Sequence, residues 1–185
     1  MKSLCVFCGA CAGTRPVYAD AARRFASLLA DRNLTLVFGG SARGLMQVLA
    51  DTVLAAGGTV IGVIPRDLVD REIAHTGLTE LHVVGSMHER KQKMADLADG
   101  FVALPGGFGT LDETAEVLTW RQLGLHQKPC GLLDVAGFYA PLLRFFDHAV
   151  DEGFIAAEQR RRLIADADPA RLLDRLAAVP ARVRG

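Results

Sequence analysis

The sequence predicts an α/β fold, in which a Rossmann-like, doubly wound parallel sheet is flanked by helices. First, short apolar runs alternate with amphipathic stretches from one end of the chain to the other, which is typical of a parallel sheet covered on both faces. Second, the chain of 185 residues corresponds to about one domain, whereas a closed barrel of eight strands and eight helices needs about 250 residues. Third, we find no linker, repeat or low-complexity stretch. Residues 1–185 are therefore expected to form a single domain.

The apolar runs, several of which end at glycine or proline, are interpreted as strands buried on both faces. They cover residues 4–8, 34–38, 60–64, 81–84, 101–104 and 131–133. Helices are expected where apolar residues recur at helical spacing, and Pro16 suits the first position of the first helix. The other helices are expected over residues 45–55, 88–97, 111–123, 141–151 and 170–178. Residues 66–79 show no clear periodicity and are expected to form a loop with a short helical turn.

The composition disfavours several classes of protein. Lys+Arg 21 and Asp+Glu 21 cancel to a formal net charge of +0, so the chain lacks the broad basic field that attracts nucleic acid or anionic membranes. Only 6% of the residues are aromatic and able to stack on bases. No run approaches the roughly eighteen apolar residues of a membrane span, and the apolar stretch at the start is too short for a signal peptide. We therefore expect a cytoplasmic protein that binds neither nucleic acid nor membranes.

Three of the four cysteines, Cys5, Cys8 and Cys11, have a C-x2-C-x2-C spacing that resembles iron–sulfur ligation. Cys5 and Cys8, however, lie in a predicted strand, where residues an odd number of positions apart point to opposite faces. Cys130 lies in another predicted strand and lacks the flanking spacing of a cluster motif. We interpret the cysteines as small buried apolar residues and expect no metal site, because the histidines show no ligand spacing either.

The 19 glycines amount to about one residue in ten, above the average of about 7%. Ligands of doubly wound sheets bind beyond the carboxyl ends of the strands, and glycines collect there: Gly9 and Gly13, Gly39, Gly40 and Gly44, and Gly106, Gly107 and Gly109. Glycine turns expose N–H groups and helix N-termini attract anions, so this sheet edge suits a phosphorylated ligand. None of the turns has the Gly-Lys-[Ser/Thr] of a Walker A loop or the G-x-G-x-x-G dinucleotide fingerprint, which disfavours NAD and FAD.

The third glycine turn, residues 105–113 (PGGFGTLDE), ends a predicted strand and opens a helix. Thr110 can serve as the N-cap and as a hydroxyl donor to phosphate. Glu113 stands three residues later, at the position of a capping-box glutamate, so it either caps its own helix or supplies a carboxylate for chemistry. Three glycines are more than capping requires, which favours the functional interpretation.

A basic cluster lies at residues 86–93 (SMHERKQK), after the strand predicted at 81–84. A charge run of this kind is usually the solvated face of a helix. This cluster, however, adjoins the carboxyl end of a strand, where a phosphate is expected to bind. Arg90 and Lys91 are therefore candidate partners for a phosphate or a carboxylate.

These motifs closely resemble those of the LOG ("lonely guy") family, the cytokinin riboside 5′-monophosphate phosphoribohydrolases, many of which were long mislabelled lysine decarboxylases. The matching segments are residues 39–46, 60–65, 87–91, 105–113, 119–120, 122–124 and 128–129. The likeness extends from the first strand to about Phe154, and the order of the Met-His-Glu-Arg-Lys and Pro-Gly-Gly-x-Gly-Thr motifs makes it specific. Two departures concern ligand contacts: Ala10-Cys11-Ala12 replaces a serine-rich turn, and Ser41 replaces the usual third glycine.

The resemblance implies a homodimer, without a cofactor, that cleaves the N-glycosidic bond of a nucleoside 5′-monophosphate to free base and ribose 5-phosphate. Cytokinin nucleotides are the signature substrates, and related bacterial proteins resemble AMP nucleosidases. Arg90 and Glu113 match the catalytic pair of the family. The positions that match its substrate-binding residues are Glu72, Arg90, Lys91, Gly107, Phe108, Gly109, Thr110, Leu111, Asp112, Glu113 and Thr119. Further candidate contacts are Gly9, Gly40, Ser41 and Glu116.

The implied chemistry fits these residues. Hydrolysis of a glycosidic bond develops positive charge on the ribose, and a carboxylate at Glu113 can stabilise that charge and orient or deprotonate water. Arg90 can bind phosphate or hold Glu113 in its ionised form, and Glu116 can assist or only form a salt bridge. A lysine decarboxylase would ordinarily need pyridoxal phosphate on a lysine. No good candidate for that lysine exists among Lys2, Lys91, Lys93 and Lys128.

One functional alternative is a non-catalytic nucleotide or molybdenum-cofactor carrier, a role suggested by similar folds. Such a carrier would bind its ligand without turnover, and a pure phosphate site gains nothing from a carboxylate beside the anion. A structural alternative concerns Trp120, Leu123 and Leu125 on the helix after the glycine turn. These side chains belong either to the core or to a dimer interface, and we interpret them as core.

Overall fold

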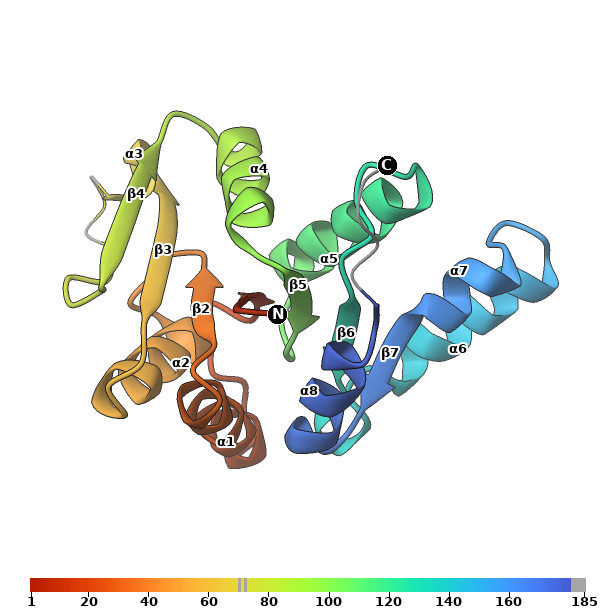
Figure 1. The fold of residues 1–185 in the computed structure, drawn as a ribbon, viewed down its shortest axis with the longest axis horizontal. Coiled ribbons are helices and arrows are strands. Elements are labelled where there is room, and N and C mark those ends of the chain that lie inside the picture. Colours follow the sequence, from red (N-terminus) through yellow and green to blue (C-terminus); the bar gives the residue numbers. More distant parts are fainter. Residues whose placement is uncertain (70, 72, 181–185) are drawn as a thin grey trace.

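The computed structural model describes residues 1–69, 71 and 73–180 (Figure 1). Its sheet has the strand order β4-β3-β2-β1-β5-β6-β7, and all neighbouring strands are parallel. The strands are β1 Ser3–Phe7, β2 Thr35–Phe38, β3 Val60–Pro65, β4 Glu80–Val84, β5 Gly100–Ala103, β6 Cys130–Leu133 and β7 Leu163–Asp166. The predicted Rossmann-like, doubly wound fold is therefore confirmed.

Helices connect the strands and cover both faces of the sheet (Figure 1). They are α1 Pro16–Asp31, α2 Gly44–Ala55, α3 Arg66–Val69, α4 Met87–Leu97, α5 Phe108–Gln122, α6 Ala140–Asp151, α7 Ala157–Arg162 and α8 Pro169–Ala177, with the 3-10 turn η1 Val135–Gly137. One face carries α1, α2 and α8, and the other carries α4, α5 and α6. Sequence order along the sheet reverses between β1 and β5, so the crevice where doubly wound folds bind ligands lies beyond the ends of these two strands.

Alternating residues of β1 enter two separate apolar cores. Leu4 and Val6 pack under α1 and α2, whereas Cys5 and Phe7 pack under α4 and α5. Cys8 joins the core of Leu4, so Cys5 and Cys8 lie on opposite faces of the sheet, and all four cysteines are free. The structure confirms that Cys5, Cys8 and Cys130 are buried, whereas the interpretation of Cys11 as a buried residue was wrong, because it lies exposed in the loop between β1 and α1. In the part of the chain that the structure describes, no group of three or more His, Cys, Asp or Glu side chains is placed to hold a metal ion.

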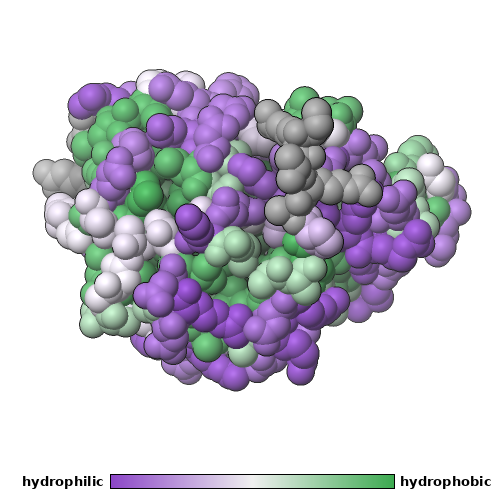
Figure 2. Space-filling model, viewed as in Figure 1, coloured by the Kyte–Doolittle hydropathy of each residue, from purple (hydrophilic) through white to green (hydrophobic). Residues whose placement is uncertain are grey.

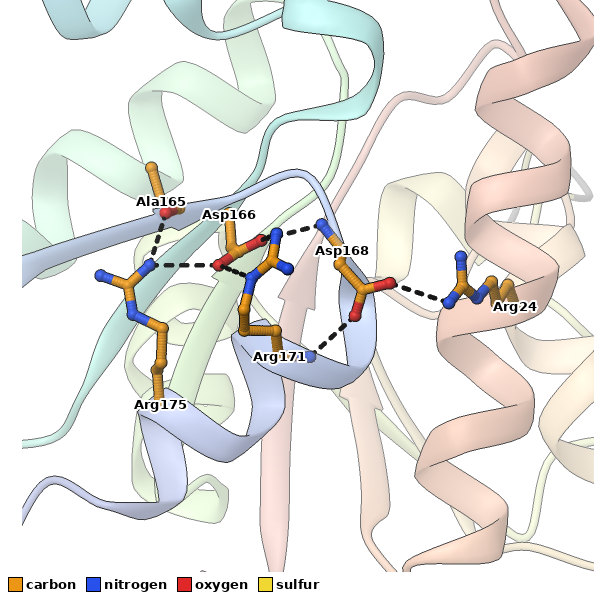
Figure 3. Close-up of polar contacts among 6 residues, drawn as sticks. All are labelled: Arg24, Ala165, Asp166, Asp168, Arg171 and Arg175. Carbon is orange, nitrogen blue, oxygen red and sulfur yellow. Dashed lines mark hydrogen bonds and ion pairs between the residues drawn. The ribbon is translucent and has the colours of Figure 1, made fainter.

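The sequence did not predict α7 and β7. α7 has the sequence AEQRRR, which offers no apolar stripe, and β7 is only four residues long. The corner between β7 and α8 is instead held by ionic contacts (Figure 3). The Asp166 carboxylate accepts hydrogen bonds from Nε and Nη2 of Arg171, each at 2.7 Å, and these bonds hold the pKa of Asp166 well below its usual range. Asp168 caps α8 through the backbone N–H of Arg171 and pairs with Arg24 of α1 at 2.8 Å.

The surface exposes several large apolar side chains. The interpretation of Leu123 and Leu125 as core residues was wrong, because these side chains are 68% and 59% exposed, whereas Trp120 packs against the α4–α5 core. The helix ends at Gln122, and the following turn carries both leucines outward. Hydrophobic residues also gather over β3 and the edge strand β4 in Figure 2. None of the helices in the described ranges is long and apolar enough to cross a membrane.

Candidate active site

A cavity of about 630 Å³ lies at the carboxyl ends of β1, β2 and β5. The three glycine turns form much of its wall. The other lining residues bring polar side chains, namely Tyr18, Ser41, Arg43, Arg90, Thr110 and Glu113, and apolar ones, among them Leu45, Met46, Leu68, Ile73, Met94, Phe108 and Phe138. A cavity of this size suits a small organic ligand.

The glycine turn after β1 packs against the turn that opens α2 and against the turn that opens α5. The N–H of Gly9 donates to the carbonyl of Pro105 at 3.0 Å, and the carbonyl of Gly9 accepts from the N–H of Leu45 at 3.0 Å. Gly44 has a φ of +56°, and a Cβ there would overlap with the backbone of Ala10. The N-terminus of α2 is therefore closed by the β1–α1 loop.

The N-terminus of α5, by contrast, is open to the cavity. Side chains added at Gly107 or Gly109 would meet nothing within 4 Å. The first N–H groups of a helix have no acceptor within it, and the helix dipole adds positive potential there. An anion such as a phosphate can therefore bind at this end of the cavity.

Thr110 does not cap α5. The N-cap is Gly107, and the helix begins at Phe108, two residues before the predicted cap. Thr110 is buried in the first turn, and its hydroxyl approaches Gly106, where a Cβ would overlap with it. Glu113 therefore lies in the second turn of the helix, with its side chain in the cavity wall. The capping-box interpretation of Glu113 was wrong.

Arg90 and Glu113 form a buried pair in the cavity wall. Nη1 of Arg90 lies 3.7 Å from Oε1 of Glu113, and each residue is only 9% exposed. Arg90 donates from Nε to the carbonyl of Val63 at 3.1 Å and from Nη2 to the carbonyl of Gly39 at 3.2 Å. The guanidinium is thus fixed to the ends of β2 and β3, and it presents its remaining nitrogen to α5.

Burial and charge oppose each other at Glu113. Burial raises the pKa of the Glu113 carboxyl, and the Arg90 charge lowers it, with burial prevailing. A carboxyl with a raised pKa is a better proton acceptor at neutral pH. Cys8 also lines the cavity, but burial raises the pKa of its thiol, so it remains protonated there.

Lys91 points away from the cavity, toward α5. Its Nζ lies 3.2 Å from Asp112 and 3.1 Å from Glu116. Burial lowers the pKa of Lys91, but the hydrogen bonds to Glu116 and Asp112 outweigh burial and raise it. Glu116 therefore forms a salt bridge in this structure, one helical turn from the Glu113 side chain.

The structure brings most of the predicted site residues together in this cavity. They are Gly9, Ser41, Arg90, Gly107, Phe108, Gly109, Thr110 and Glu113. The predicted positions outside its wall are Gly40, Lys91, Leu111, Asp112, Glu116 and Thr119, and Glu72 lies outside the described residues. Sequence reasoning missed Tyr18, Arg43 and Phe138. Only Arg43 carries a sequence signal, because it follows a strand-end glycine turn.

Comparisons with known proteins place this chain in a family. A family model described as "Possible lysine decarboxylase" matches residues 46–176. The chain is 49% identical over 177 residues to cytokinin riboside 5′-monophosphate phosphoribohydrolase LOG5 of Arabidopsis thaliana, covering 96% of this chain and 78% of that protein. It is 50% identical over 172 residues to cytokinin riboside 5′-monophosphate phosphoribohydrolase LOG of Oryza sativa subsp. japonica, covering 93% and 71%.

Solved structures share the fold. The molybdenum cofactor carrier protein of Chlamydomonas reinhardtii matches with a TM-score of 0.72 and 26% identity over 96% of this chain and 98% of that one. The molybdenum cofactor binding protein of Rippkaea orientalis matches with a TM-score of 0.73 and 20% identity, over 97% and 98%.

Fold and site together define an α/β protein whose crevice combines an open helix N-terminus with a buried Arg–Glu pair. The chain belongs to the LOG family of cytokinin riboside 5′-monophosphate phosphoribohydrolases, the family that carries the "Possible lysine decarboxylase" description. The resemblance drawn from the sequence motifs is thereby confirmed.

Proposed function

We propose that this protein hydrolyses the N-glycosidic bond of cytokinin riboside 5′-monophosphates, giving the free base and ribose 5-phosphate. The relatives that are 46–50% identical to it carry the name of this activity. The observation that carries the proposal is the buried Arg90–Glu113 pair beside the open N-terminus of α5. AMP, which has the same ribose 5-phosphate, is a second substrate in this proposal.

The 5′-phosphate binds at the N-terminus of α5. The backbone between Gly107 and Thr110 offers N–H groups and no negative charge, and Gly107 and Gly109 leave room for close approach. Binding energy from this remote phosphate positions the ribose next to Glu113.

Glu113 acts on the ribose. As the bond between C1′ and the base breaks, positive charge develops on the ribose, and the Glu113 carboxylate stabilises it. The oxygen of a water molecule bonds to C1′, and its proton passes to Glu113, whose raised pKa suits it to accept a proton. The base leaves with the electron pair of the broken bond and takes up a proton.

Arg90 positions Glu113 and favours the ionised form of its carboxyl group. Its charge lowers the pKa of Glu113, against the effect of burial. Two backbone carbonyls hold the guanidinium in place, so this pair needs no reorganisation when substrate binds.

Two other functions fit the structure less well. A decarboxylase of the pyridoxal phosphate type would need a lysine in the cavity, and none of the four lysines, all of them described, lines it. A non-catalytic carrier of a nucleotide or of the molybdenum cofactor would need the anion site alone. A buried carboxylate beside an anion weakens anion binding, so Glu113 favours an enzyme.

The proposal includes a homodimer in the cytoplasm. Exposed large apolar side chains lie on the first turn of α5 and in the turn after the helix. They are Phe108, Leu111, Leu123 and Leu125. Exposed large apolar side chains support contact with another protein surface, and a second copy of this chain is the partner that the family resemblance implies. The unpaired cysteines support a reducing compartment.

Incubation of the purified protein with isopentenyladenosine 5′-monophosphate and with AMP tests the proposal. We expect free base and ribose 5-phosphate in equal amounts from at least the cytokinin nucleotide. A carrier would instead retain a stoichiometric ligand through purification and release no base from any purine nucleotide, which would overturn the proposal.

A further inference from the structure

A buried hydroxyl at the β2 end of the cavity has no partner. Ser41, the third residue after β2, lines the cavity and is only 5% exposed. Its Oγ makes no hydrogen bond within the described ranges of the chain. Buried hydroxyls are normally satisfied, so an orphan in a ligand cavity indicates a partner that arrives with the ligand.

The backbone around Ser41 is fixed on both sides. The N–H of Ala42 donates to the carbonyl of Ile73 at 2.8 Å, and the N–H of His75 donates to the carbonyl of Gly40 at 2.9 Å. Ser41 itself forms an antiparallel bridge with Ala74. The unpaired hydroxyl is therefore not a consequence of a loose loop. Because its Oγ is covered in this conformation, it would meet a ligand only after rotation about χ1.

The surroundings of Ser41 suit a heterocycle better than a phosphate. Met46, Leu68 and Ile73 give this end of the cavity an apolar wall. Arg43, from the same turn, lines the cavity with an exposed side chain, but the N-terminus of α2 that follows is closed by Ala10. Flat bases bind in apolar pockets that carry a few placed polar groups.

The layout of the sheet puts the base at this end. β2 and β5 lie on either side of β1, so their ends are about 10 Å apart, two strand spacings. That separation matches the distance from the phosphate to the base in an extended nucleotide. Arg90 is bonded to the carbonyl of Gly39 at the end of β2 and faces Glu113 on α5, so the reactive pair lies between the two ends.

We infer that Ser41 recognises the base. Its hydroxyl donates a hydrogen bond to a ring nitrogen of the purine while the phosphate is bound at α5. This inference rests on the proposed function and adds the orientation of the substrate in the cavity. Ser41 is thus a specificity-determining residue for the leaving base.

The test combines Ser41→Ala with four substrates, namely AMP and its 1-deaza, 3-deaza and 7-deaza analogues. We expect Ser41→Ala to lower kcat/KM for AMP about tenfold, the effect of one lost hydrogen bond. For the one analogue that lacks the bonded nitrogen, the same substitution changes nothing, because wild type has already lost the bond. Ser27→Ala, a half-buried serine on α1 outside the cavity, is the matched control.

A second readout separates this role from a structural one. Removing an unpaired buried hydroxyl leaves the melting temperature of the free protein unchanged or raises it, whereas loss of a structural hydrogen bond lowers it. An equal loss on all four substrates, no loss on any, or a lower melting temperature would overturn the inference. The proposed function fails only if wild type also releases no base from isopentenyladenosine 5′-monophosphate. If wild type does not hydrolyse the four AMP-type nucleotides, calorimetric binding of the same four nucleotides to both proteins decides the role of Ser41.

Discussion

The guanidinium of Arg90 lies 3.7 Å from the carboxylate of Glu113, and both side chains are almost completely buried. Arg90 reaches this position from α4 because the carbonyls of Val63 and Gly39 hold two of its nitrogens. Glu113 reaches it from the second turn of α5. Two helices thus place one charged pair in the crevice at the switch point of the sheet.

Glu113→Gln removes the charge and the proton acceptor but keeps the shape of the side chain. We expect kcat to fall by about 10²–10⁴-fold, the usual contribution of a general acid or base, while nucleotide binding persists at α5. Steady-state kinetics and calorimetric titration with AMP measure the two effects. Glu116→Gln is the control, because Glu116 pairs with Lys91 outside the cavity. Equal losses in the two variants would contradict the assignment.

Gly39→Ala tests the placement of Arg90 without touching its charge. A Cβ at Gly39 would overlap with Nη2 of Arg90, so the guanidinium must leave its present position beside Glu113. A misplacement of about 1 Å in a catalytic group costs roughly 10²-fold in rate, and we expect a loss of that order in kcat/KM. Gly77→Ala serves as the control, since a Cβ there makes only ordinary contacts. A fully active Gly39→Ala enzyme would show that the position of Arg90 is unimportant.

The pH dependence of the reaction reports the state of Glu113. Burial raises the pKa of this carboxyl above its ordinary value, and the ionised form is the active one, so activity falls as the pH drops through the raised pKa. The acid limb of kcat/KM therefore lies above the ordinary glutamate pKa of about 4.3. Arg90→Met removes the charge that lowers this pKa, so the limb moves to still higher pH. An acid limb that stays in place in Arg90→Met would rule out this coupling.

Asp166 stabilises the β7–α8 corner. Its side chain is only 7% exposed and accepts two hydrogen bonds from Arg171 (Figure 3). Asp166→Asn is expected to lower the free energy of unfolding by about 2 kcal/mol, as for hydrogen bonds to a charged group. The melting temperature then falls by about 4–8 °C for a chain of this size. Asp174→Asn, which breaks an exposed pair with Arg32, is expected to cost much less.

The effect of Asp166→Asn also depends on pH. The Arg171 bonds lower the pKa of Asp166 in the folded state, so the stabilisation is fully present above the unfolded pKa of about 3.9 and is lost as the pH falls below it. Thermal unfolding of both proteins at neutral pH and near pH 3 measures the difference. A gap in melting temperature that stays constant between the two conditions would contradict the ionic role.

The proposed dimer depends on exposed leucines after α5. Leu123→Glu and Leu125→Glu place charges on a surface that two copies would bury, so we expect the double variant to be a monomer in light scattering while its circular dichroism is unchanged. Phe154→Glu is the matched control, because Phe154 is also exposed but lies between α6 and α7, so we expect this variant to keep the dimer. A wild-type monomer at micromolar concentration would contradict the dimer.

The sequence predicted the sheet and most of the helices because apolar runs and helical spacing are local properties. The strand–glycine–helix pattern at residues 105–113 also located the open helix N-terminus. The helix start was misplaced at Thr110 because Gly107 caps α5 with backbone alone. β7 was missed because its last residue, Asp166, is satisfied by arginines nearby in α8, a contact that no strand pattern reveals.

The sequence also could not predict that Arg90 lines the cavity whereas Lys91 pairs with carboxylates on α5. Consecutive residues on a helix point about 100° apart, so only one of them can enter the cavity. Arg90 does so because Gly39 leaves space for it, and Lys91 meets Asp112 and Glu116 on α5. The rings of Tyr18 and Phe138 contact each other edge to face, with their centroids 5.8 Å apart. These residues are 120 positions apart in the sequence, and such a long-range contact leaves no local signal.

In the proposed mechanism, Glu113 drives hydrolysis of a nucleoside 5′-monophosphate bound at α5. The most direct measurement is mass-spectrometric quantification of free base and ribose 5-phosphate released from isopentenyladenosine 5′-monophosphate by wild type and by Glu113→Gln. We expect equimolar products from wild type and at most about one-hundredth of that rate from the variant. No release by wild type, or equal release by both proteins, would contradict the claim.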